Sequence, residues 1–362
     1  MFVAWRDLRF ARGRFALMGT VIVLITLLVG LLSGLTAGLG QQNISAVTGL
    51  PADRIAFQAP SGGQDVSYSH STVTGKQWQQ WAEAPGVTSA EPLGITTTKA
   101  TADDRSTAVS AFGVQPGSRL APDSDRIDGK SAVLSTTAAD DLGVTAGDAF
   151  TLAGRQLTVA SVQGDAFFSH TPVVWTSLDV WRETAPPTAG VDGPAATVIA
   201  LNTTSRADTA ATDRAVGTRT LSKDDSLSAI GSYTSENGSL QLMRGFLFAI
   251  SALVIGAFFT VWTIQRSGDV AVLKALGAST AHLLKDALGQ AVVLLAGGTL
   301  IGTGIAAVLG TLVAGSAVPF VLTPATVLFP AVVMILLGAL GAALSIRRIT
   351  SVDPLTALGS AR

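Results

Sequence analysis

The chain has 362 residues, of which 48% are hydrophobic and 14% are charged, and its mean hydropathy is +0.46. This balance excludes an ordinary water-soluble protein and is typical of a membrane protein with a sizeable aqueous part. A net charge of −1 gives no general attraction to nucleic acid. The absence of cysteine excludes disulfides and thiolate metal sites, and the three histidines lack the spacing of a zinc enzyme.

The N-terminal region predicts a membrane-surface helix followed by a membrane span. Residues 1–14 interleave aromatic side chains with arginines, the pattern of a cytoplasmic interfacial amphipathic helix. Residues 15–39 carry no charge and are long enough to cross a bilayer, and the preceding arginines place the N-terminus in the cytoplasm. Gly30, Gly34 and Gly38 recur every four residues, which predicts close packing with another helix; ordinary use of glycine in a span is the alternative.

Residues 40–239 form a polar, turn-rich insertion that we expect to fold outside the membrane. β-branched or alternating segments predict strands, and amphipathic segments predict helices. The expected strands are 131–135, 150–152 and 156–162, and the expected helices are 74–84 and 135–142. The predicted fold is therefore an α-helical four-span transmembrane domain with a large α+β extracytoplasmic domain inserted between spans 1 and 2.

Three further apolar tracts follow, separated by a charged elbow and a short turn. Because the first span leaves the cytoplasm, the second must return to it, and the basic residues of the elbow and of the tail agree with that topology. Prolines flank the outer turn and interrupt the helical pattern there. The expected segments are 240–264 (span 2), 265–282 (elbow), 283–314 (span 3), 315–323 (outer loop), 324–346 (span 4) and 347–362 (cytoplasmic tail).

The elbow and the tail carry motifs of a known family. They are Arg266, Asp269, Val272, Leu273, Lys274, Ala275, Leu276, Gly277 and Ala278 in the elbow, and Arg347, Arg348, Ile349, Asp353, Pro354, Ala357 and Leu358 in the tail. With these motifs the chain resembles the FtsX/MacB-like ABC-transporter permeases, the mechanotransmission family. Its opening, Arg-Asp-Leu-Arg-Phe-Ala followed by Gly-Arg-Phe-Ala-Leu-Met-Gly, is similar to that of the compact haem-exporter permeases of this family, the HrtB type.

The resemblance implies an assembly of separate parts. Two permeases would pair as a homodimer in the bacterial plasma membrane, and two copies of an ABC ATPase subunit would bind ATP below them. The elbow would be the coupling helix that contacts the ATPase, through Arg266, Asp269, Val272, Leu273, Lys274, Leu276 and Gly277. The chain itself is expected to be non-catalytic and to have no intrinsic cofactor, because residues 124–131 miss the first glycine of a phosphate-binding loop. The expected partners also include membrane lipid and exclude nucleic acid.

Polar residues at the outer end of span 2 are the candidate substrate site. Glu236 lies beside the span, and Arg244 lies inside its outer end, where a charge is costly. In a two-fold dimer, two copies of Glu236 would face each other over an apolar crevice. Such a crevice suits a flat, apolar ligand with a metal centre, and haem is the expected ligand, with Glu236 or Tyr233 on the iron and Arg244 near the propionates. The resemblance to haem-exporter permeases implies the same ligand. The candidate set is Glu236, Tyr233, Leu240, Met243 and Arg244, and no other metal site is expected.

Other interpretations of these residues stay open. Glu236 can be a solvated carboxylate favoured by a helix N-terminus, and Arg244 can be an anchor for lipid phosphate. The same motifs fit an FtsX-like permease that regulates an extracytoplasmic cell-wall hydrolase without transporting a substrate. They also fit a permease that exports lipoproteins or peptide antibiotics.

Overall fold

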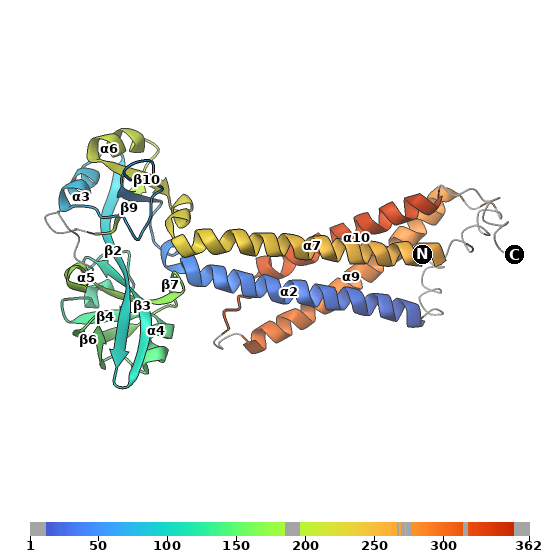
Figure 1. The fold of residues 1–362 in the computed structure, drawn as a ribbon, viewed down its shortest axis with the longest axis horizontal. Helices are drawn as coiled ribbons and strands as arrows, with labels where there is room; N and C mark the ends of the chain where they lie inside the picture. The colour runs from blue at the N-terminus through green and yellow to red at the C-terminus, as the bar shows by residue number, and fades with distance from the viewer. Residues whose placement is uncertain are drawn as a thin grey trace. The chain divides into compact units, whose positions relative to one another are not determined.

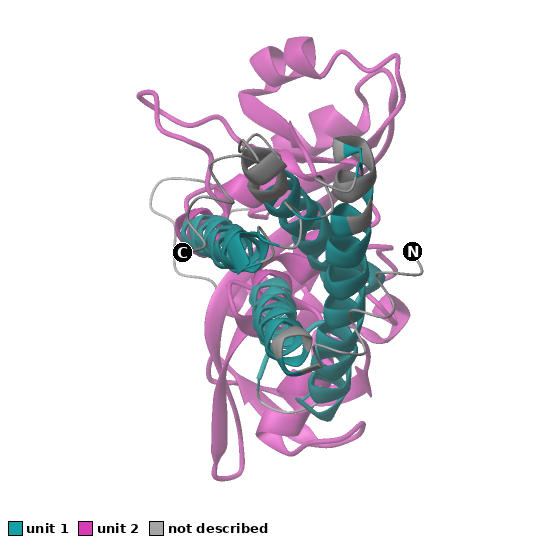
Figure 2. Cartoon of the chain, turned by 90° about the vertical axis from the view of Figure 1, so that its right-hand side faces the viewer, with its two compact units in different colours: residues 1–39, 239–362 teal, residues 40–238 magenta. Residues whose placement is uncertain are grey.

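In the computed structural model the chain divides into two compact units (Figure 2). The inserted domain comprises residues 40–238, and the helical unit comprises residues 1–39 and 239–362. The structure describes residues 12–184, 196–265, 268, 272, 277, 279–313 and 318–350.

Within the described residues, four helices are long and apolar enough to cross a membrane (Figure 1). They are α2 (Arg12–Thr48), α7 (Gly231–Gln265), α9 (Thr280–Val313) and α10 (Pro324–Thr350). Two of them are longer than the spans predicted from hydropathy, since α2 runs on past residue 39 and α7 starts before residue 240. The additional turns belong to the inserted domain, so both helices continue beyond the apolar tract that identifies the span.

The glycine row of α2 meets two kinds of neighbour. A Cβ added to Gly30 would lie 2.9 Å from a Cβ of α9, so the two helices approach closely at this point. Gly34 and Gly38 instead face the extended segment before α10: an added Cβ would overlap the ring of Phe320 at the first and the carbonyl group of Pro319 at the second. Gly30 therefore lies against another helix, whereas Gly34 and Gly38, for which the sequence also predicts helix packing, lie against a loop.

The inserted domain is built on a twisted ten-stranded sheet with the order β10-β1-β9-β2-β3-β8-β4-β6-β5, and β7 pairs with β8. Its strands are β1 (Arg54–Gln58), β2 (Val87–Ala102), β3 (Arg105–Val114), β4 (Ser131–Leu134), β5 (Ala149–Leu152), β6 (Arg155–Val162), β7 (Phe167–Phe168), β8 (Thr171–Ser177), β9 (Val198–Thr203) and β10 (Thr218–Ser222). The long strand β2 joins two lobes, because its first half pairs with β9 and its second half with β3 and β5 (Figure 1). The α+β fold is confirmed.

Short helices cover this sheet, namely α3 (Gly75–Ala82), α4 (Thr136–Leu142), α5 (Leu178–Thr184) and α6 (Thr209–Val216), with 3₁₀ turns at Ser124–Arg126 and Asp225–Ala229. Two of the helices begin where the sequence predicts them. Thr74 and Gln77 form a capping box ahead of α3. Ser135 caps α4, which ends at Gly143 in the left-handed region. Strands β4, β5 and β6 occupy the three stretches predicted as strands.

Aromatic rings fill the core of the domain. Phe57, Tyr68, Phe168, Phe112 and Trp175 follow one another edge to face, with ring centroids 4.8, 5.5, 5.6 and 5.0 Å apart. Such contacts add about 0.5–1.5 kcal/mol per pair to the free energy of burial. Phe168 is the last residue of β7, so this packing fixes the start of the β7–β8 turn that contributes to the candidate site.

Candidate functional site

Glu236 lies in the second turn of α7, inside the inserted domain, where two polar side chains contact its carboxylate. Its Oε2 atom lies 2.7 Å from Nε2 of His170 and accepts a hydrogen bond of 3.3 Å from Nδ2 of Asn43. The side chains of Glu236 and His170 are 44% and 30% exposed, so the carboxylate is held on one side and open to solvent on the other. We call Asn43, His170 and Glu236 the carboxylate cluster.

Asn43 is the buried member of the cluster, with 1% of its surface exposed. Its Oδ1 accepts a hydrogen bond of 2.6 Å from the hydroxyl of Ser232, which lies 2.8 Å from the hydroxyl of Ser169. Because Oδ1 has a donor, the amide nitrogen Nδ2 is the atom that faces the carboxylate. A buried amide with its hydrogen bonds made on both sides has one orientation, and it presents a fixed donor to Glu236.

His170 is placed by a tight hairpin turn between β7 and β8. Phe168 pairs with Thr171, so Ser169 and His170 are the two turn residues, and their φ angles are 51° and 65°. Two-residue hairpins take this left-handed backbone, and Gly is the residue that adopts it at the lowest cost. The backbone N–H groups of Ser169 and His170 donate to the carbonyls of Asn43 and Gln42, at 3.0 Å each. These bonds to α2 offset the strain of the turn.

The short contact between His170 and Glu236 assigns a proton. A carboxylate oxygen can approach an imidazole nitrogen to 2.7 Å only when a hydrogen lies between them. A carboxylate has no hydrogen to give, so beside the ionised form of Glu236 the Nε2 atom carries the N–H and donates to Oε2. The Nδ2 of Asn43 lies 3.1 Å from the same ring nitrogen and shares Oε2 with it as a second donor. Two donors thus converge on one oxygen of Glu236.

His170 and Asn43 were missed by the sequence analysis, which identified Glu236 by its place beside a span. They precede Glu236 by 66 and 193 residues, and no local pattern joins positions so far apart. One cue was available in retrospect: Ser169 and His170 are two polar residues between apolar segments, the length of a tight hairpin.

The other predicted substrate residues do not join this cluster. Tyr233 packs its ring against the core of the inserted domain. Leu240 and Met243 lie further along α7, in the helical unit, where Leu240 is half-buried and Met243 is 50% exposed.

Arg244 has its own surroundings in the helical unit. Its guanidinium carbon lies 5.9 Å from the ring centre of Phe248, on the same helix, and 5.2 Å from that of Phe329 in α10. Each is within cation–π range, which stabilises a charge in an apolar environment. The Nε atom is buried and has no hydrogen-bond partner among the described residues. The charge is therefore stabilised by aromatic faces while one of its donors is left free.

Family comparisons cover almost the whole chain. The MacB-like periplasmic core domain family matches residues 15–219, and the family described as FtsX-like permease C-terminal matches residues 242–354. The first of these matches alone spans more than half of the chain. The chain belongs to the FtsX/MacB-like permeases. It is therefore a multi-pass membrane protein whose MacB-like domain is extracytoplasmic, and a non-catalytic subunit of an ABC transporter that works with an ATPase partner.

Curated relatives match the permease from end to end. A protein of Staphylococcus haemolyticus named "Putative hemin transport system permease protein HrtB" is 25% identical over 366 residues, covering 99% of both chains. A protein of the same name from Staphylococcus epidermidis is 24% identical over 364 residues, again with 99% of both chains covered. An uncharacterized ABC transporter permease of Mycobacterium tuberculosis is 25% identical over 374 residues at the same coverage.

Solved structures of extracytoplasmic permease domains align with about half of the permease. The crystal structure of the periplasmic region of MacB from Actinobacillus actinomycetemcomitans aligns with a TM-score of 0.34 and 10% identity, over 50% of this chain and 94% of that one. The extracellular domain of the ABC-type transporter YknZ from Gram-positive bacteria aligns with a TM-score of 0.32 and 15% identity, over 46% and 89%.

The predicted coupling residues of the permease fall largely outside the described residues. This holds for Arg266, Asp269, Leu273, Lys274 and Leu276. Two members of the set are described: Val272 is 54% exposed, and Gly277 has a φ of 92° just before α9 begins. Glycine adopts this left-handed backbone at low cost.

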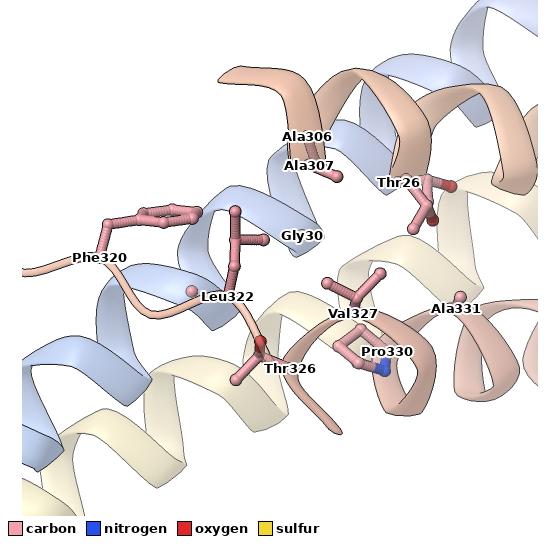
Figure 3. A pocket seen from close by; sticks show the side chains of 12 residues that line it. Thr26, Gly30, Ala306, Ala307, Phe320, Leu322, Thr326, Val327, Pro330 and Ala331 are labelled. Atoms are coloured by element: carbon pink, nitrogen blue, oxygen red, sulfur yellow. The ribbon is translucent and has the colours of Figure 1, made fainter. Parts of the chain in front are cut away.

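A small pocket lies within the helical unit of the permease, among α2, α9, α10 and the extended segment before α10 (Figure 3). Its walls are mostly apolar or small residues, with the hydroxyl of Thr26 buried and without a hydrogen-bond partner among the described residues. Phe320 and Leu322 close one end of it (Figure 3). The lining residues are Thr26, Gly30, Gly34, Thr303, Ala306, Ala307, Phe320, Leu322, Thr326, Val327, Pro330 and Ala331.

Proposed function

We propose that this permease exports haem, which it takes up at the outer leaflet of the bacterial plasma membrane with energy from its ATPase partner. Two findings support the proposal: the full-length similarity to proteins named for hemin transport, and the carboxylate of Glu236 at the start of α7. The second carries it, because an ordered and half-exposed carboxylate can bind ferric iron.

The chemistry of haem accounts for the remaining candidates. Haem is a flat apolar ring with an iron centre and two carboxylate groups at one edge. Glu236 would bind the iron, and Leu240 and Met243, which follow it on α7, would contact the ring. Arg244 would pair with a propionate through the positive charge of its guanidinium group. Tyr233 is the weaker ligand in this scheme, since its ring already packs in the core of the domain.

ATP hydrolysis would act on this site from the opposite side of the membrane. In the proposed assembly, two permeases form a homodimer with their termini in the cytoplasm, and two ATPase subunits contact the coupling helix, residues 265–282. Both α2 and α7 are unbroken helices that begin or end within the inserted domain, so each can carry a displacement along its axis as a rigid rod.

A haemin titration of the purified permease with its ATPase tests the proposal. Wild type is compared with Glu236→Gln and with Glu83→Gln, a matched control at an exposed carboxylate in the same domain. We expect saturable binding near one haem per permease dimer in wild type and the control. For Glu236→Gln we expect an affinity about tenfold lower and an altered absorption spectrum. Diffuse, detergent-like partitioning in all three proteins would overturn haem as the substrate and favour the regulatory function.

A further inference from the structure

We propose that His170 is a positioning residue for the substrate ligand Glu236: it occupies Oε2 and thereby directs the other oxygen, Oε1, to the iron. The inference rests on the proposed function and identifies how the same site is built. It follows from the division of hydrogen bonds on this one carboxylate.

The two oxygens of Glu236 differ in their surroundings. Oε2 receives the N–H of His170 at 2.7 Å and that of Asn43 at 3.3 Å. Oε1 has no hydrogen-bond partner among the described residues, and the side chain is 44% exposed. A carboxylate with one oxygen bound by two donors and the other open is arranged for monodentate ligation. Ligating carboxylates in metal sites are commonly held by hydrogen bonds of this kind.

The two hydrogen bonds also fix the orientation of the ligand. Asn43 can act only as a donor at this point, because its Oδ1 is already bonded to Ser232. His170 is the closer donor of the two, so it has the larger part in fixing the orientation of the carboxylate.

The turn that holds His170 supports this role. At φ 65° a glycine has no Cβ penalty and a histidine does, so a turn optimised for stability alone would carry glycine. The chain instead places a long donor at this position and secures the turn with two backbone hydrogen bonds to α2. The hydrogen bond that the imidazole donates to Glu236 gives a reason for the strain.

Two substitutions at the same position separate positioning from turn geometry. His170→Gly removes the donor and relaxes the backbone, whereas His170→Gln keeps an N–H donor at nearly the position of Nε2. His70→Gly is the matched control, because His70 is an exposed histidine in the same domain. Haemin is titrated into each permease–ATPase complex, and affinity and absorption spectrum are recorded. Size-exclusion and thermal unfolding profiles check each fold.

We expect His170→Gly to bind haemin about tenfold more weakly than wild type and to shift the iron-dependent absorption bands, although its thermal stability is equal or higher. His170→Gln should recover most of the affinity and the wild-type spectrum, and His70→Gly should match wild type. A second variant, Asn43→Leu, removes the other donor at similar volume and should weaken binding about threefold.

Each outcome decides the inference. Wild-type affinity and spectrum in His170→Gly, together with lost binding in Glu236→Gln, would overturn the role of His170 and leave haem export intact. Equal losses in His170→Gly and His170→Gln would also overturn it, because a donor at this position would then have no effect. An absence of saturable binding in wild type would overturn the proposed function itself, and the inference with it.

Discussion

In the inserted domain the largest apolar side chains are the most deeply buried, whereas in the helical unit many of them are exposed. Phe57 and Phe112 have no exposed surface, while Leu253, Leu300 and Leu312 of the long helices are 73%, 72% and 75% exposed. The two units share one chain, so the difference comes from their surroundings. Burial of apolar surface is favourable in water, whereas in the hydrocarbon of a membrane it brings no such gain in free energy.

In the helical unit, glycines lie at the closest contacts between elements. Along α2 and α9 the close contacts occur at glycines, where an added Cβ would collide with a neighbouring helix or loop. Ile22 and Val23 of α2, for example, lie against Gly298 and Gly302 of α9. Helices in a membrane associate through close van der Waals contact, which glycine allows. Large side chains therefore fill the core of the inserted domain, whereas in the helical unit glycines allow the closest contacts between elements.

The largest expected effect is in the domain core. Phe112→Ala removes a ring that touches both Phe168 and Trp175, and it should lower the free energy of unfolding of the domain by about 3–5 kcal/mol. Leu312→Ala, at a side chain 75% exposed, is the control in the helical unit and should change it by less than about 0.5 kcal/mol. Urea unfolding followed by tryptophan fluorescence measures both. Equal losses in the two variants would contradict the comparison.

The next largest effect is in the helical unit, where the substitution enlarges a side chain and does not shorten one. Gly34→Ala adds a methyl group against the ring of Phe320, and we expect a loss of about 1–3 kcal/mol. Gly19→Ala lies on the same helix with no atom within 4 Å of the added Cβ, so it should instead gain up to about 1 kcal/mol from helix propensity. Thermal unfolding in detergent distinguishes them. A gain at both positions would show that Gly34 is no packing site.

A buried phenol gives the domain a pH dependence. Burial raises the pKa of Tyr68 well above its usual value, and its hydroxyl lies 3.0 Å from the Ser226 hydroxyl. The folded state therefore keeps the proton when the unfolded chain loses it, so stability is complete below about pH 10 and falls as pH rises further. Tyr68→Phe should cost about 1 kcal/mol at neutral pH and show a weaker alkaline decline. Parallel slopes above pH 10 would exclude Tyr68 as the cause.

The smallest effect tests a turn without a functional role. Ala153 is exposed, with a φ of 49°, in the turn between β5 and β6, and Ala153→Gly should stabilise the domain by about 0.5–1 kcal/mol. The neighbouring Gly154, with a φ of 87°, provides the reverse control, since Gly154→Ala should destabilise it. Chemical unfolding of both variants checks the sign. A loss in Ala153→Gly would mean that the methyl group makes a stabilising contact.

The sequence predicts well those elements that are determined by neighbouring residues along the chain. Alternation and β-branching located β4, β5 and β6, amphipathic patterns located α3 and α4, and long uncharged tracts located the four apolar helices. Hydropathy could not show that α2 runs on to Thr48, because the polar residues after the span are satisfied by the domain and not by lipid. Tertiary contacts also determine the neighbours of Gly34 and Gly38, and they alone bring His170 to Glu236.

The hydrogen bonds of Asn43 have a consequence for modularity. This residue lies near the start of the inserted domain, and its partners Ser232 and Glu236 lie near the end, so the two ends of the insertion are fastened to each other within the domain. An insertion whose two ends are held together joins the rest of the chain at neighbouring points. Its length and interior can therefore vary without moving these points of attachment. The same closure makes residues 40–238 a natural unit for excision and for transplantation between permeases.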